Sequence, residues 1–308
     1  MPLHGESIRW QESEPQAQQP ALHIRVAIAA MRGASRLSFR ALSRLGVVLG
    51  TLLWLLPSAR RRVARVNLAL CLPQWSAWQR ERLLRRNFVA LAQMVLEYGY
   101  CWFAPRQVLE QLVRIEGAQH LHRDDGRPVI LSMPHFTGLD LAGLRLSLEI
   151  PIVSVYSRQT DAALDARMRQ GRLRFNTGII FPRQAGIRPV IKAMKAGYAL
   201  YYLPDQDLGT RDAVFADFFG VPAATITALS RLAAMTNAVV LPCRPRRERD
   251  GYTVVVDPPL ADFPGADPAH DAQRMNHLIE QQVLLQPHQY FWLHRRFKSR
   301  PAGSASVY

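Results

Sequence analysis

The stretch RPVILSMPHFTGLDLAGLRLSLE, residues 127–149, passes from an apolar run through a short loop into a helical pattern. Its first part, RPVILSM, has the apolar, β-branched composition of a buried strand. Pro134 disfavours helical geometry at the residue before it, so we expect the strand to end at Met133. Leucines recur at helical spacing in LDLAGLRLSLE. The stretch therefore predicts a strand, the loop PHFTG and a helix, which is the repeating unit of an α/β fold.

The same alternation of strand and helix patterns continues along the chain. The predicted strands are LVRIEG, PVILSM, PIVSVY, GIIFP, YALYYL, AVVLPC and YTVVVD. The predicted helices after the first hundred residues are 138–149, 160–175, 185–196, 223–236 and 270–286. This alternation predicts an α/β domain with a mixed, largely parallel sheet flanked by helices. The polar stretch RPRRERDG, 244–251, is expected to connect two strands as a hairpin.

The N-terminal third differs in composition. Arg32, Arg36, Arg40 and Arg44 recur every four residues and predict a basic stripe on a helix. The uncharged run LGVVLGTLLWLLP, 45–57, follows, and it is shorter than the roughly 20 residues that a spanning helix needs. We interpret this region as a membrane-associated helical segment that lies at an anionic membrane surface. The alternative is a buried helix of a soluble protein with solvated arginines.

These patterns divide the chain into four segments. A further helix is predicted over 76–104. The predicted segments are a disordered tail at 1–20, a helical membrane-anchoring region at 21–105, a catalytic α/β domain at 106–300 and a tail at 301–308.

Charge and cysteine content restrict the classes of partner. The chain has 308 residues with 39 Lys and Arg against 24 Asp and Glu, a formal net charge of +15. Such a surface favours nucleic acid, anionic lipid or an acidic protein. Cys71, Cys101 and Cys243 form no C-x-x-C motif, so neither a disulfide framework nor a zinc site is predicted.

The loop after the central predicted strand carries the candidate catalytic residues. In open α/β sheets ligands bind beyond the carboxyl ends of the strands, where His135 is expected to lie. Asp140 follows five residues later and would orient the imidazole of a general base. The competing interpretation is structural, because Thr137 and Asp140 also fit a capping box at the start of a helix.

Two later motifs have competing interpretations. PDQDLG contains Asp205 and a D-x-D pattern that suits a hard cation, although we favour a loop in which Asp205 pairs with an arginine. His294, in WLHRRFK, is interpreted as a structural or surface residue. The mixture of aromatic and basic residues there also permits a nucleic-acid-binding protein, the rival from another functional class.

Several blocks of sequence in a fixed order carry a resemblance to a known family. These are NLALCLP, RNFVALAQMVLEYGYCWF, HFTGLD, VYSRQTD, GRLR, PDQD and WLHRRFK. Together they resemble the bacterial lipid A biosynthesis lauroyl/myristoyl acyltransferase family over roughly residues 25–301. The resemblance implies a glycerolipid-acyltransferase-like fold and an enzyme on the cytoplasmic face of the inner membrane. It implies acyl carrier protein as the acyl donor and a hydroxyl of a Kdo-bearing lipid A precursor as the acceptor.

The resemblance also implies roles for individual residues. His135 and Asp140 match the catalytic pair, and Arg172, Asp205 and Arg158 are expected to bind substrate. No cofactor, no metal and no nucleic acid is expected. Asp140 stands where many lauroyl-type members carry Glu, which places the carboxylate one methylene closer to the backbone. A related acyltransferase that acts on another glycolipid or on a glycerophospholipid is the nearest alternative.

Overall fold

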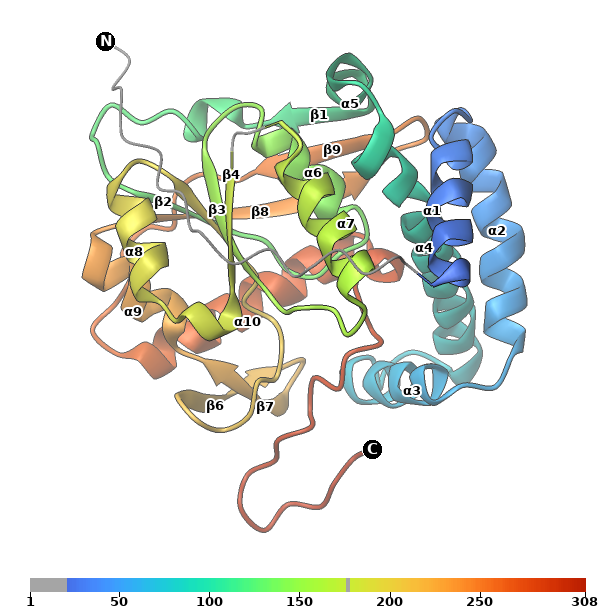
Figure 1. Cartoon of the computed structure of the whole chain (residues 1–308). Coiled ribbons are helices and arrows are strands. Elements are labelled where there is room, and N and C mark those ends of the chain that lie inside the picture. The colour runs from blue at the N-terminus through green and yellow to red at the C-terminus, as the bar shows by residue number, and fades with distance from the viewer. Residues whose placement is uncertain (1–20, 176–177) are drawn as a thin grey trace.

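The computed structural model describes residues 21–175 and 178–308, so the predicted tail at 1–20 lies outside the described residues. Figure 1 shows a sheet with helices on both faces and a group of N-terminal helices packed at one side. The helices are α1 Leu22–Ala34, α2 Phe39–Leu55, α3 Ala59–Cys71, α4 Ala77–Phe103, α5 Arg106–Leu112, α6 Leu139–Leu146, α7 Ala162–Leu173, α8 Arg188–Lys195, α9 Ala228–Thr236 and α10 Pro268–Leu285.

The strands form two sheets. They are β1 Val113–Glu116, β2 Val129–Ser132, β3 Ile152–Tyr156, β4 Gly178–Pro182, β5 Ala199–Tyr202, β6 Ala213–Phe218, β7 Val221–Ile226, β8 Val239–Arg247 and β9 Tyr252–Val256. The main sheet has the order β1-β9-β8-β2-β5-β3-β4, and only the β8–β9 pair is antiparallel. The predicted mixed, largely parallel sheet and its hairpin between β8 and β9 are therefore confirmed.

The two faces of the sheet follow the period-2 alternation of its strands. Val129 and Leu131 of β2 pack into a core formed with α4 and α6. Ile130 points to the other face and packs with residues of α8 and α9. The α4 side chains Tyr100 and Cys101 are buried in the first of these cores, so the N-terminal helices and the sheet share apolar packing.

Two predictions about local structure are corrected, and one hairpin was not predicted. The basic stripe does not lie on one helix, because α1 ends at Ala34 and α2 begins at Phe39 with Ser38 as its N-cap. Residues 223–226 belong to β7 rather than to the helix that was predicted from 223. The antiparallel β6–β7 hairpin was not predicted, because Gly220 and its neighbours join two strands that lack a strong apolar alternation.

Glycines let α2 pack closely on α4. A Cβ atom at Gly46 would lie 2.3 Å from Cγ of Gln93, and one at Gly50 would lie 2.4 Å from Cα of Val89. The opposite face of α2 is exposed and apolar, with Leu45, Val47, Val48, Leu49, Leu52, Leu53 and Leu55 all at least 37% exposed. The uncharged run thus has a glycine face that packs inside and a leucine face that meets solvent.

No single helix among the described residues is long and apolar enough to cross a membrane. Helices α2 and α3 pass the same length and composition test only as a pair, and a 91° bend separates them. Residues 301–308 form neither helix nor strand, but the Tyr308 hydroxyl donates to Oδ1 of Asn67 in α3 at 2.5 Å.

Candidate active site

The loop after β2 is held by two other segments of the chain. The amide of His135 donates to Oδ2 of Asp205 (2.9 Å), and the carbonyl of His135 accepts from the amide of Phe291 (2.8 Å). The amide of Thr137 donates to the carbonyl of Gln289 (2.8 Å). These backbone contacts hold the His135 loop in place at the carboxyl edge of the sheet.

The carboxylate that contacts the imidazole belongs to Asp205. Its Oδ1 lies 2.6 Å from Nδ1 of His135, and the residue is only 1% exposed. Burial opposes the charge of Asp205, but the neighbouring His135 outweighs it and lowers the pKa of the carboxyl to about 2. An ionised carboxylate only accepts hydrogen bonds, so Nδ1 of His135 carries a proton, and in the neutral ring with this tautomer Nε2 holds the lone pair.

Asp140 has a different set of partners. The Tyr98 hydroxyl of α4 donates to its Oδ2 (2.5 Å), and Nε of Arg172 in α7 donates to its Oδ1 (2.8 Å). The expectation that Asp140 directly orients His135 is therefore corrected in favour of Asp205. Asp140 is the second residue of α6, where its side chain is directed toward α4 and α7.

The capping-box interpretation of Asp140 is also wrong. The N-cap of α6 is Gly138 with φ of 84°, and no side chain caps this helix. A Cβ atom at Gly138 would lie 2.4 Å from the ring of Tyr252, so the close approach and the positive φ both require glycine. The Thr137 hydroxyl donates to Oε1 of Gln289 instead of capping.

Electrostatics keep the Asp140–Arg172 contact an ion pair. Burial opposes the charge of Asp140, but the Arg172 guanidinium and the Tyr98 hydroxyl outweigh it, so the pKa of Asp140 lies below its ordinary value. Asp140 in turn raises the pKa of Arg172. Burial raises the pKa of Tyr98, which therefore stays protonated as the donor.

Two residues outside the predicted set extend the site. The side-chain nitrogen of Gln206 lies 2.8 Å from Nε2 of His135 and 2.6 Å from Nε2 of His294. Burial, together with the neighbouring His135, lowers the pKa of His294 to about 4. His294 is half-buried rather than on the surface, and its ring faces His135 with 5.1 Å between the centroids.

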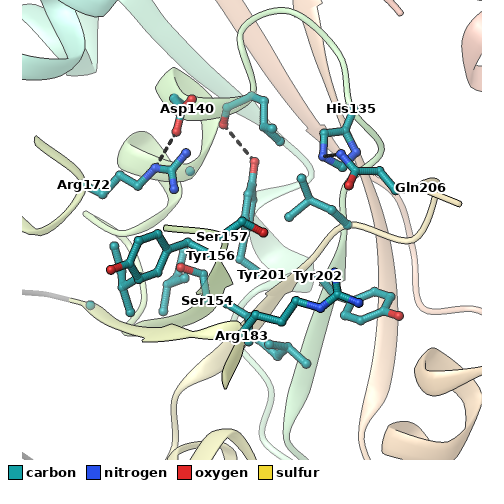
Figure 2. Close-up of a pocket in the computed structure, with 18 of the residues that line it drawn as sticks. His135, Asp140, Ser154, Tyr156, Ser157, Arg172, Arg183, Tyr201, Tyr202 and Gln206 are labelled. Atoms are coloured by element: carbon teal, nitrogen blue, oxygen red, sulfur yellow. Dashed lines mark hydrogen bonds and ion pairs between the residues drawn. The ribbon is translucent and has the colours of Figure 1, made fainter. Parts of the chain in front are cut away.

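A largely apolar cavity of about 700 Å³ adjoins these groups. Figure 2 shows His135 with Gln206 at one side and the Asp140–Arg172 pair at another, around the space that the cavity occupies. Strands β3 and β5 pair as far as Ser154 and Tyr201, and both of these residues line the cavity. Its apolar walls include Leu139, Leu144, Ile152, Ile180, Val190, Leu200 and Leu232.

The remaining predicted residues have other surroundings. Arg158 is exposed in the loop after β3, between the cavity-lining residues Ser157 and Gln159. The second acid of the D-x-D pattern, Asp207, accepts from the amide (2.6 Å) and hydroxyl (2.9 Å) of Ser299. The two acids of that pattern thus bind different protein groups, and no metal-binding cluster occurs in the described part of the chain.

Sequence reasoning missed Tyr98, Gln206 and His294 as members of the site. Tyr98 lies in a long helix whose apolar spacing concealed its polar contact with Asp140. Gln206 lies between Asp205 and Asp207, which form the D-x-D pattern that suits a hard cation. The available signal was the short motif itself, because a glutamine beside a buried carboxylate after a central strand occupies the edge where ligands bind.

Comparison with known proteins assigns the chain to a family. The profile of the bacterial lipid A biosynthesis acyltransferase family matches residues 14–299. The chain is 33% identical over 278 residues to a lipid A biosynthesis lauroyltransferase of Escherichia coli K12, which covers 89% of this chain and 90% of the relative. A palmitoleoyltransferase from the same organism gives the same identity and coverage. A myristoyltransferase from it is 31% identical over 272 residues, 87% of this chain and 83% of the relative.

Proposed function

The chain belongs to the bacterial lipid A biosynthesis acyltransferases, and from that premise we propose that it moves an acyl chain from acyl carrier protein to a hydroxyl of a hydroxyacyl chain on the Kdo-bearing lipid A precursor. It is thus an O-acyltransferase of lipid A biosynthesis, as its relatives are by name. The observation that carries the proposal is the imidazole of His135, whose Nδ1 lies 2.6 Å from the buried carboxylate of Asp205, at the side of a largely apolar cavity.

His135 acts as the general base. The pKa of an alcohol lies far above neutral pH, so a hydroxyl that attacks a thioester must lose its proton in the transition state. Nε2 takes this proton while Asp205 holds Nδ1 and stabilises the imidazolium that forms. The proton then passes to the departing thiolate. No serine or cysteine nucleophile is required, and the cysteines are buried free thiols.

The cavity holds the acyl chain. Its volume of about 700 Å³ lies inside the range of roughly 300–1,000 Å³ that is usual for ligand sites. Apolar walls favour a hydrocarbon chain by removing its surface from water. The thioester carbonyl would then lie at the His135 side of the cavity.

Arg172, held in place by Asp140, binds the polar part of the substrate. Arg172 donates to Asp140 through Nε, which leaves the two terminal nitrogens of its guanidinium for a phosphate or carbonyl oxygen in the cavity that it lines. Tyr98 and Asp140 hold the guanidinium in place. Arg158, beside the same cavity, is a further contact for an anionic substrate.

The exposed face of α2 contacts the membrane. Its leucines and valines form a continuous apolar face on one helix, and the exposed Arg44 and Arg62 flank it at α2 and α3. An amphipathic surface of this kind inserts into the boundary between headgroups and acyl chains without spanning the bilayer. We place the enzyme on the cytoplasmic face of the bacterial inner membrane, where an acidic carrier protein can reach its basic surface.

Mass spectrometry of lipid A tests the function. Cells that express the protein should contain a lipid A species that is one acyl chain heavier than the species in cells that lack it. The same mass increase is expected when the purified protein is given acylated carrier protein and the Kdo-bearing precursor. Identical lipid A in both strains, with no acylated product in vitro, would contradict the proposal.

A further inference from the structure

The side chain of Gln206 contacts Nε2 of His135, the atom that receives the proton in the proposed reaction. Its amide nitrogen is 2.8 Å from Nε2 of His135 and 2.6 Å from Nε2 of His294. An amide nitrogen donates two hydrogen bonds and accepts none, so both imidazoles accept from it. Gln206 therefore occupies, in the free protein, the place that the acceptor hydroxyl must take during the reaction.

The backbone on both sides of Gln206 is anchored. Asp205 before it is buried and bonds to the ring and the amide of His135. Asp207 after it accepts from Ser299 and from the amide of Gly209 (2.9 Å). The backbone that carries Gln206 is thus fixed on both sides, so its amide group can leave Nε2 only by a rotation of the side chain.

His294 is equally well positioned. The side-chain nitrogen of Asn67 donates to the carbonyls of Trp292 and His294, each at 2.7 Å, and Trp292 is 1% exposed. The ring of His294 therefore provides a fixed second acceptor for Gln206. If a substrate hydroxyl replaces Gln206 at Nε2 of His135, the hydrogen bond to His294 still holds the amide group of Gln206 in place.

We propose that Gln206 is a catalytic residue whose amide N–H donates to the carbonyl oxygen of the acyl donor as negative charge develops there, and that His294 is its positioning residue. The proposal rests on the acyl transfer described above. The substrate hydroxyl displaces the amide from Nε2 of His135, and the freed N–H lies next to the reacting carbon.

The chemical step balances as follows. The hydroxyl oxygen forms a bond to the thioester carbon, its proton goes to Nε2 of His135, and the carbonyl electron pair moves onto oxygen beside the Gln206 N–H. Collapse of the intermediate restores the carbonyl and breaks the C–S bond. The sulfur leaves with the proton from His135, so no oxidant or further reactant is required.

Three substitutions at Gln206 test this role. Gln206→Leu removes the donor and should lower kcat by about 10²- to 10³-fold, the usual loss for one oxyanion donor, with little change in KM. Gln206→Glu keeps the size but offers only acceptors, so it should lose a similar factor. Because its carboxylate favours the charged form of His135, it should also move the acidic limb of the pH–rate profile to higher pH. Gln206→Asn should recover part of the rate.

Gln281 provides the matched control, because on the surface of α10 its side-chain nitrogen lies 3.1 Å from Nε2 of His277. Gln281→Leu should leave kcat unchanged. Thermal melting of every variant separates catalysis from folding, and the size-matched Gln206→Glu decides if Gln206→Leu does not fold.

The outcomes distinguish this inference from the function on which it rests. A wild type that acylates no lipid A precursor overturns both. A wild type that acylates it, together with Gln206→Leu or Gln206→Glu variants that keep the wild-type kcat, overturns only the role of Gln206. Loss of rate in Gln206→Glu without the shift of the pH profile would also contradict the contact with His135.

Discussion

At the scale of single residues, the two carboxylates of the candidate site have different partners. Asp205 is buried against the ring of His135, whereas Asp140 forms an ion pair with Arg172 and accepts from Tyr98. In the proposed mechanism, the first acid holds Nδ1 of the general base. The second acid holds the guanidinium of Arg172.

Asp205→Asn tests the first of these assignments. The amide keeps the size of the side chain but cannot stabilise an imidazolium, so kcat should fall by about 10²- to 10⁴-fold while the fold persists. Asp250→Asn is the control, because Asp250 is exposed and pairs with the exposed Arg40. Steady-state kinetics in which both variants retain wild-type turnover would remove Asp205 from the mechanism.

A double-mutant cycle tests the second assignment. Asp140→Asn leaves the Arg172 guanidinium without its charge partner and should lower kcat/KM by about 10²-fold. Arg172→Gln should have a similar effect, and the double variant should be little worse than either single variant because the two side chains act as one unit. Strictly additive losses in kcat/KM would show that they act separately.

At the scale of elements, α2 uses its two faces for different purposes. Gly46 and Gly50 allow the helix to approach α4, while the leucines on the opposite side remain in contact with solvent. The same composition explains why the sequence alone permitted both a membrane-associated helix and a buried helix of a soluble protein. One side of α2 is buried in the protein, and the opposite side is exposed and apolar.

Gly50→Ala should destabilise the protein. The added Cβ meets backbone atoms of Val89 and Phe88, and overpacking of this kind costs about 1–3 kcal/mol. Gly33→Ala in α1 is the control, because nothing lies within 4 Å of its added Cβ and alanine is favoured in a helix by about 0.5–1 kcal/mol. Chemical denaturation should therefore give changes of opposite sign, and equal changes would contradict the close packing of α2 on α4.

Replacing Leu49, Leu52 and Leu53 together by serine should reduce sedimentation with anionic vesicles. High salt should weaken binding of the wild type without abolishing it, because the apolar contact is unscreened while the charges are screened. Leu284 and Leu285 of α10 are also exposed, and their replacement by serine is the control. Equal vesicle binding by all three proteins would exclude α2 as the membrane contact.

At the scale of the whole molecule, most of the fold follows from local sequence pattern, because parallel strands are apolar on both faces and alternate with helices. All seven strands of the main sheet were predicted. The interruption of the arginine stripe at residues 35–38 was not, because spacing alone does not reveal the Ser38 cap. The partner of His135 was also missed. Asp205 is 70 residues away in the chain, and only the neighbouring strands β2 and β5 bring the two together.

Stability should decline in mild acid. The pKa of His294 is lowered from 6.5 to about 4, so the unfolded chain binds this proton at higher pH than the folded protein does. Its contribution is fully present above pH 6.5 and is lost as pH falls toward 4, up to on the order of 3 kcal/mol. Melting temperatures across this range should fall less steeply for His294→Gln. Parallel curves for the two proteins would contradict the burial of a neutral His294.

The central claim is that the protein transfers an acyl chain to the lipid A precursor with His135 as the general base, and one measurement tests it most directly. Purified wild type and His135→Ala are each incubated with acylated carrier protein and the Kdo-bearing precursor. The mass and amount of the lipid product are then measured by mass spectrometry. We predict one added acyl chain with the wild type and a rate about 10²- to 10⁴-fold lower with a His135→Ala protein that melts at nearly the same temperature. Equal amounts of product from the two proteins, or none from the wild type, would contradict the account.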